Sequence, residues 1–157
     1  MDRVAVAVLA TLDSKHEVAR FVCDALTAAG AAPWLVDLSL RPHAHDFADV
    51  SGETVAKSAG LTWAELGRLT RADAAKAMIL GGTEIVRAKC ARREIGGVLG
   101  VGGANGSTIA CAIMRALPIS FPKVMVTPVA ATAAVQWYVA ESDIAMYPTI
   151  GDISLNR

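Results

Sequence analysis

The sequence lacks the cysteines that a disulfide-stapled or zinc-bound domain requires. Its three cysteines, Cys23, Cys90 and Cys111, are an odd number without paired spacing. An excess of charge of either sign is also missing, because 15 basic and 15 acidic side chains cancel. No overall attraction therefore draws the protein toward nucleic acid or an anionic membrane, and any anionic ligand has to be held by local groups.

Long uncharged apolar runs are absent as well. Apolar residues make up 54% of the chain, but no run reaches the roughly 18 residues that a membrane span needs. The first residues include an acid and show no small-residue cleavage site after a basic lead, so they predict no secretory signal. We therefore expect a cytoplasmic protein whose residues 1–157 form one domain with a sizeable core.

Apolar runs of strand length alternate along the chain with segments of helical periodicity. Residues 4–11 form a continuous apolar run, typical of a strand buried on both faces of a parallel sheet. Ser14 and Glu17 then have the spacing of a capping box, and a helical pattern runs from them to Gly30. We expect further strands at residues 32–39, 96–103, 123–130 and 142–149, and further helices from the capping pairs Thr62–Glu65 and Thr70–Asp73 and over residues 107–117.

This alternation predicts an α/β fold with an open, mostly parallel five-stranded sheet, helices on both faces and right-handed crossovers, either Rossmann-like or flavodoxin-like. Residues 41–60 are polar without a clear period and predict a surface loop. Gly81 and Gly82 lie within the long helix that follows Thr70. For them we favour close packing against a neighbouring helix, or a local break, over contact with a ligand.

The carboxyl ends of the predicted strands carry the polar and glycine-rich residues of the chain. In open α/β sheets, ligands bind outside these ends, at the point where the strand order reverses. The segments that leave strand ends here are residues 10–17, 102–108 and 127–132. We expect the three segments to meet and form the binding site.

The glycine-rich segment lacks the two standard phosphate-binding signatures. Ser107 stands where a Walker loop needs lysine, and Asn105 stands where the dinucleotide fingerprint needs its third glycine. What remains is a strand that leads through Gly102, Gly103 and Gly106 into a helix, which leaves unpaired N–H groups at the positive end of the helix dipole. The segment predicts an anion site, or alternatively only a tight turn that lets the helix pack on the sheet.

The turn after the first strand combines hydroxyls, a carboxylate and a cation in Thr11, Asp13, Ser14 and Lys15. Lys15 is suited to phosphate oxygens, and Asp13 to a magnesium ion or a ribose hydroxyl. The alternative is that Asp13 or Ser14 only caps the helix and that Lys15 points into water.

Other chemistry has weaker support in the sequence. His43, His45 and Asp46 lie in a polar stretch without further ligands, so we expect a solvated loop and no metal site there. Ser107 lacks the nucleophile elbow, and no histidine follows it, which excludes a hydrolase triad in its usual chain order.

The motifs TLDSK, GVLGVGGANGST, MRALP, PKVMVTPVA, SDI and the closing DISLN occur in this order over nearly the whole chain. Together they resemble the ATP-binding domain family of the tomato mosaic virus resistance protein, an uncharacterised family. The resemblance implies an α/β amino-terminal domain that binds ATP at the strand ends, in dimeric proteins that continue into a second α/β domain. Because the sequence ends at Arg157, we expect either an excised domain or a second half made as a separate subunit.

The chain departs from the family pattern at several positions. In the loop, Ala104, Asn105 and Ser107 replace a serine, a glycine and a threonine, so one hydroxyl contact to phosphate is lost at Ala104 while Ser107 keeps its own. Ala10 and His16 replace glycines of the first motif, so the backbone there approaches a ligand less closely.

We therefore expect a cytoplasmic, homodimeric domain that binds ATP, with or without Mg²⁺, and acts by conformational or assembly control. Two alternatives stay open: half of an enzyme whose second domain completes a site for phosphoryl or acyl chemistry, and a structural dimerisation module without a ligand. No catalytic residue is assigned. The predicted nucleotide-binding residues are Thr11, Asp13, Ser14, Lys15, Gly102, Gly103, Ala104, Asn105, Gly106, Ser107, Thr108 and Thr127.

Overall fold

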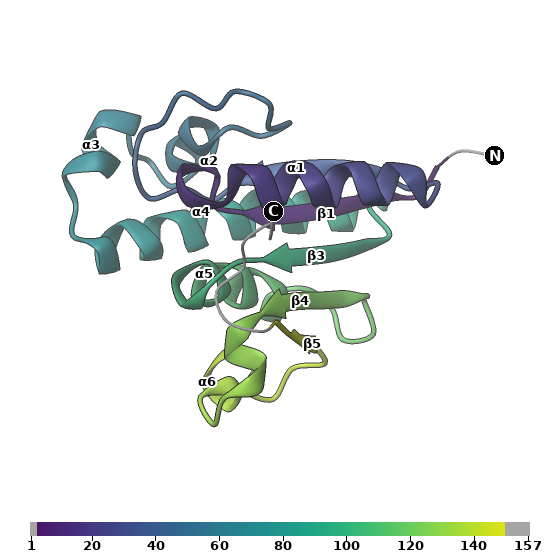
Figure 1. Cartoon of the computed structure of the whole chain (residues 1–157). Coiled ribbons are helices and arrows are strands. Elements are labelled where there is room, and N and C mark those ends of the chain that lie inside the picture. The colour runs from purple at the N-terminus through teal and green to yellow at the C-terminus, as the bar shows by residue number, and fades with distance from the viewer. Residues whose placement is uncertain (1–2, 150–157) are drawn as a thin grey trace.

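The protein, seen here as a computed structural model that describes residues 3–149, is built on one five-stranded parallel sheet (Figure 1). The DISLN motif lies outside the described residues. The strand order β2-β1-β3-β4-β5 is that of flavodoxin-like sheets, and the predicted α/β class is confirmed. The strands are β1 (Ala5–Ala10), β2 (Ala32–Asp37), β3 (Gly97–Val101), β4 (Lys123–Thr127) and β5 (Ala145–Pro148).

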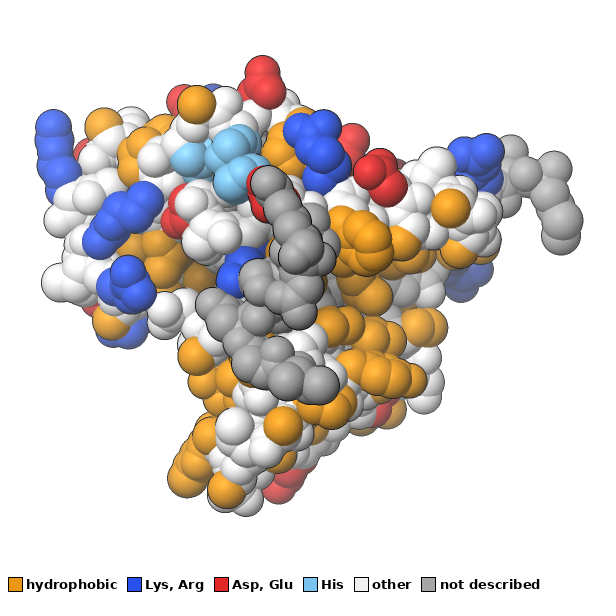
Figure 2. Space-filling view, in the orientation of Figure 1, with side chains coloured by type: hydrophobic (Ala, Val, Ile, Leu, Met, Phe, Trp, Pro, Cys, Tyr) orange, Lys and Arg blue, Asp and Glu red, His pale blue; other side chains and the backbone are white. Residues whose placement is uncertain are grey.

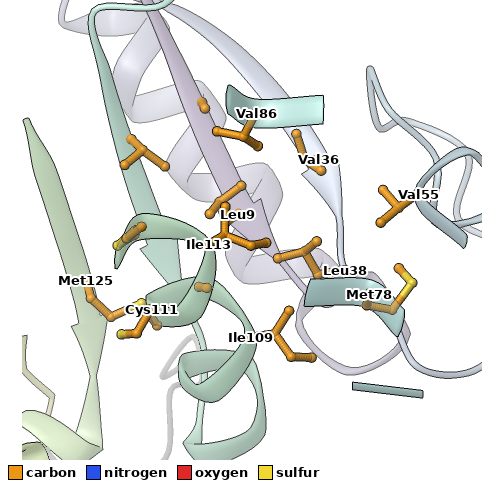
Figure 3. Close-up of a cluster of buried hydrophobic side chains, with 14 of the residues drawn as sticks. Leu9, Val36, Leu38, Val55, Met78, Val86, Ile109, Cys111, Ile113 and Met125 are labelled. Atoms are coloured by element: carbon orange, nitrogen blue, oxygen red, sulfur yellow. The ribbon is translucent and has the colours of Figure 1, made fainter. Parts of the chain in front are cut away.

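Helices cover the two faces of the sheet unequally (Figure 1). One face carries α1 alone, and the other carries α2, α4 and α5 over the larger apolar core, in which Leu9, Leu38, Met78 and Ile113 meet (Figure 3). Within residues 3–149 no helix is both long and apolar enough to cross a membrane. The helices are α1 (Leu12–Ala28), α2 (Gly52–Ser58), α3 (Trp63–Arg68), α4 (Arg71–Ala91), α5 (Ala104–Arg115), α6 (Val135–Val139) and the 3₁₀ helix η1 (Pro128–Ala131).

The helices that are capped by side chains three residues apart begin where the sequence predicts them to begin. Thr62 and Glu65 form the predicted capping box of α3, and the Thr70 side chain accepts the Asp73 N–H at the start of α4. The first helix begins at Leu12, two residues before the predicted Ser14, and is kinked at Lys15, where the backbone is not helical (φ −130°). Its first N–H groups donate to the side chains of Asp37, the last residue of β2, and Ser39, just after it, which no local pattern indicates.

Two predicted boundaries in the middle of the chain also need correction. Residues 41–60 are not simply a surface loop, because they contain α2, which buries Val55 and Ala56 against α4. The helix after β3 begins at Ala104, not at Ser107, so that the glycine-rich segment supplies the first turn of α5.

The glycine pair in α4 serves close packing, as predicted, and α4 continues through it without the alternative break. A Cβ atom on Gly81 would lie 2.0 Å from the carbonyl oxygen of Val55 in α2. A Cβ atom on Gly82 would lie 2.6 Å from Cδ1 of Ile113 in α5. The missing side chains thus let α4 approach both neighbours.

Candidate functional site

A cavity of about 700 Å³ lies at the carboxyl edge of the sheet. Two of the predicted segments meet there, and Pro128 contributes from the third. The loop after β2 and the start of α4 complete the wall. The lining residues are Thr11, Asp13, Ser14, Lys15, Leu40, Arg41, Pro42, His43, Arg71, Gly103, Ala104, Asn105, Gly106 and Pro128.

The remaining predicted residues, Gly102, Ser107, Thr108 and Thr127, do not line the cavity. Ser107 and Thr127 are fully buried, and the Ser107 hydroxyl donates to Thr127 Oγ1 at 2.7 Å. Thr108 is exposed and donates to the Ala104 carbonyl oxygen at 3.0 Å. A Cβ atom on Gly102 would lie 3.1 Å from the Gly106 Cα atom, so Gly102 lets the α5 turn fold close to the end of β3.

The amino terminus of α5 faces the cavity with unused backbone donors. Gly103 is its N-cap residue, no side chain caps it, and the first backbone bond of the helix is the one from the Ser107 N–H to the Gly103 carbonyl. Among the described residues, the N–H groups of Ala104, Asn105 and Gly106 therefore have no acceptor. These groups lie at the positive end of the helix dipole and favour a negative charge.

The amino terminus of α1, on the same cavity, is used differently. Its Leu12 N–H donates to Asp37 Oδ1 at 3.2 Å, and its Asp13 N–H donates to Ser39 Oγ at 2.9 Å. The Asp13 carboxylate in turn accepts the Leu40 N–H at 3.2 Å. These bonds fasten the loop after β2 to the start of α1, so Asp13 acts here as a structural group of the cavity wall.

Three cations line the cavity and come from three different elements. Lys15 belongs to α1, Arg41 to the loop after β2, and Arg71 to the first turn of α4. Figure 2 shows lysine and arginine side chains on both sides of the histidines on this face. Sequence reasoning missed Arg41 and Arg71 because neither belongs to a motif, and only the packing of α4 and of the loop brings them to the strand ends.

A buried carboxylate supports the wall from behind. Asp37, at the end of β2, is 2% exposed, and its Oδ1 atom accepts hydrogen bonds from the Ser39 N–H at 3.0 Å and the Ser39 hydroxyl at 2.5 Å. Its Oδ2 atom lies 2.8 Å from His43 Nε2. The His45 N–H donates to His43 Nδ1 at 3.1 Å, so Nε2 carries the proton and donates to Asp37. Both ring nitrogens of His43 are hydrogen-bonded, which fixes the ring in the cavity wall.

The loop that carries His43 and His45 is largely exposed, as expected, but its histidine rings pack together. The rings of His16 and His45 are stacked with their centroids 3.8 Å apart, and His43 lies 5.4 Å from His45. Desolvation and then the neighbouring His16 and His43 lower the pKa of His45. Within residues 3–149 no three His, Cys, Asp or Glu side chains are grouped so that they could hold a metal ion.

Comparison with known proteins identifies relatives along nearly the whole chain. The model of the uncharacterised protein family UPF0261, N-terminal domain, matches residues 4–157. UPF0261 proteins of Rhizobium meliloti and Mesorhizobium japonicum are 40% and 38% identical over 152 residues, which is 96% of this chain and 37% of each relative. The chain thus spans little more than a third of the length of these curated relatives.

The likeness to the tomato protein is weaker than its motifs imply. The ToMV resistance protein Tm-1 of Solanum lycopersicum is 34% identical over 61 residues, which is 39% of this chain and 8% of that protein. The similarity is partial.

Proposed function

Since the chain belongs to the UPF0261 amino-terminal domain family, we propose that this domain binds the phosphate groups of a nucleotide, with ATP as the first candidate. The observation that carries the proposal is the convergence of the uncapped α5 terminus with Lys15, Arg41 and Arg71 on one cavity. Helix N–H donors and several cations match the oxygens of a polyphosphate. The choice of ATP among nucleotides comes from the motif resemblance.

The cavity is suitable for a ligand of this size. Its volume of about 700 Å³ falls within the range of roughly 300–1,000 Å³ usual for small-molecule sites. Its position at the carboxyl ends of β1 and β3, the two strands between which the order reverses, is the place where open parallel sheets bind ligands. We place the phosphates over Ala104 to Gly106, with Arg41 and Arg71 on the opposite wall.

Binding is proposed to control conformation or assembly, in a homodimer of the longer protein. Neither ring nitrogen of His43 is open to a substrate proton, and the cavity lining contains no other histidine. The enzyme alternative therefore requires catalytic groups from the part that follows this domain in the relatives, such as a base for phosphoryl transfer. Mg²⁺ would enter with the nucleotide, because Asp13 is the carboxylate of the cavity lining and already accepts a backbone bond.

Isothermal titration with ATP, with and without Mg²⁺, tests the proposal. Arg71→Gln should weaken binding about ten- to hundredfold, because a charge-assisted hydrogen bond contributes about 1.5–3 kcal/mol. Arg87→Gln is the matched control, since Arg87 is exposed on the same helix and does not line the cavity. Equal affinities in these two variants would place the nucleotide elsewhere, and absence of binding by the folded wild-type chain would refute nucleotide binding by this domain.

Gly106→Ala separates a ligand-binding glycine from a structural one. A Cβ atom there would lie no closer than 3.9 Å to its neighbours, so the fold has room for it. The methyl group would stand beside the N–H groups that we assign to phosphate. We expect unchanged or slightly higher stability with weaker ATP binding. Full affinity in this variant would contradict the placement of phosphate at these N–H groups.

A further inference from the structure

Among residues 3–149, half of the sheet has no helix on the face that carries α1. That helix packs on β1 and β2 and buries Val101 at the end of β3, whereas no described helix lies over the same face of β4 and β5 (Figure 1). The side chains of β4 are buried to different extents on the two faces of the sheet. Lys123, Met125 and Thr127 point toward α5 and are buried, whereas Val124 and Val126 point the other way and are only half-buried. Parallel sheets are normally buried on both faces, so this half lacks a cover from the part of the chain that the structure describes.

The uncovered half forms an apolar groove beside α1. Its volume is about 410 Å³, and every residue that lines it is apolar. Phe21 on α1 is 59% exposed, and Tyr147 of β5, which pairs with Val126, is 60% exposed. Figure 2 shows hydrophobic side chains gathered on this face. We call the surface formed by Phe21, Val22, Leu26, Leu99, Val126 and Tyr147 the open sheet face.

We propose that the open sheet face is the docking surface for the carboxy-terminal part of the family's longer proteins. The matching family model is that of an N-terminal domain, and the chain spans 37% of the relatives, so most of their length follows the matched segment. The last described strand, β5 (Ala145–Pro148), lies at the edge of the sheet and contributes Tyr147 to the open sheet face. A segment tethered to the same chain reaches this face at a small cost in loop entropy.

The apolar lining of the groove determines which kind of segment can dock there. A lining without charged groups favours a lasting, water-free contact, as between parts of one protein, over a transient encounter. The occupant is therefore an apolar face, such as one side of an amphipathic helix that completes the layer begun by α1. This inference does not depend on nucleotide binding.

Cysteine labelling tests the docking. Residues 1–157 are fused to the carboxy-terminal part of the Rhizobium meliloti relative, and the maleimide labelling rate of Phe21→Cys is compared with that in the 157-residue chain. Leu80→Cys on α4 is the matched control, because Leu80 is 62% exposed and does not line the groove. Mass spectrometry of the labelled peptides separates the introduced cysteines from the native ones.

We expect Phe21→Cys to react about tenfold more slowly in the fusion, because docking buries it, and Leu80→Cys to react equally in both proteins. Val126→Lys, added to the fusion, should restore the fast rate. Equal rates for Phe21→Cys in both proteins would overturn the proposal. Protection in the 157-residue chain alone, rising with its concentration, would also overturn it, because a second copy would then cover the face. If circular dichroism shows that the fusion does not fold, the two parts are mixed as separate chains and the same rates decide.

Discussion

Replacement of Gly81 by alanine raises the helix propensity of α4 but creates a clash between α4 and α2. The added methyl carbon would lie 2.0 Å from the Val55 carbonyl oxygen, 3.0 Å from its carbon and 3.2 Å from the Ala59 nitrogen. All three atoms belong to the backbone of α2 and its C-cap, so no side-chain rotation relieves the clash. The two helices have to move apart by more than 1 Å to restore ordinary contact.

The net effect can be worked out from two opposing contributions. Alanine in place of glycine stabilises an exposed helix interior by about 1 kcal/mol. Overpacking in a close contact costs about 1–3 kcal/mol and sometimes more, and separation of α2 from α4 also opens the packing around Val55 and Met78. Because the clash is with backbone atoms, the cost lies at the upper end of this range. We expect Gly81→Ala to lower the free energy of unfolding by about 2 kcal/mol net, or about 4–8 °C in Tm for a domain of this size.

Urea unfolding, followed by far-UV circular dichroism, measures this change. The matched control is Gly67→Ala in α3, where a Cβ atom would meet the nearest atoms, in the Pro42 ring, at an ordinary 3.5 Å. This variant should be neutral or gain up to about 1 kcal/mol from helix propensity. Gly82→Ala should lie between the two, because its obstacle is the movable end of Ile113. A Gly81→Ala protein as stable as the Gly67→Ala protein would refute the close approach of α2 and α4.

Two further predictions concern buried polar groups near the carboxyl end of the sheet and at its opposite end. Thr127→Val removes the acceptor of the Val129 N–H and of the Ser107 hydroxyl, and should cost about 1–3 kcal/mol in urea unfolding; an unchanged midpoint would contradict this. The hydrogen bond from the buried Lys123 ammonium, with one from the Ser120 N–H, lowers the pKa of Asp143 below 3.8. Its stabilising effect is therefore complete above that value and lost as pH falls through the lowered pKa, so the stability difference between wild type and Asp143→Asn should shrink in acid. A difference that stays constant down to pH ~2 would contradict the ion pair.

The strands and the capped helices were predictable because their signals are local. The apolar run at residues 4–11 contains β1, and the Thr62–Glu65 pair starts α3 through contacts three residues apart. By contrast α2 was missed, because its short helix depends on burial of Val55 and Ala56 against a helix far along the chain. The helix α6, which buries no residue, was missed because five residues are too few to show a helical period.

The candidate site was predictable to the extent that it follows from topology. Parallel strands place their carboxyl ends together, so the segments after β1 and β3 had to be neighbours. The loss of Ser107 and Thr127 from the cavity lining was not predictable, because the hydroxyls bond to each other only after α5 packs on β4. Whether the residues on the cavity bind ATP remains a prediction.

From the sequence alone came the alternation of strands and helices, hence the parallel sheet, and the glycine-rich turn that opens α5. Both depend on periodicity and on backbone freedom, which neighbouring residues decide. Tertiary structure alone decided that Asp37 and Ser39 cap α1 while α5 stays open to the cavity, and that Arg41 and Arg71 join Lys15 there. It also decided which half of the sheet α1 covers. The physical reason is that partners and burial are set by elements distant in the chain, whose approach no local pattern encodes.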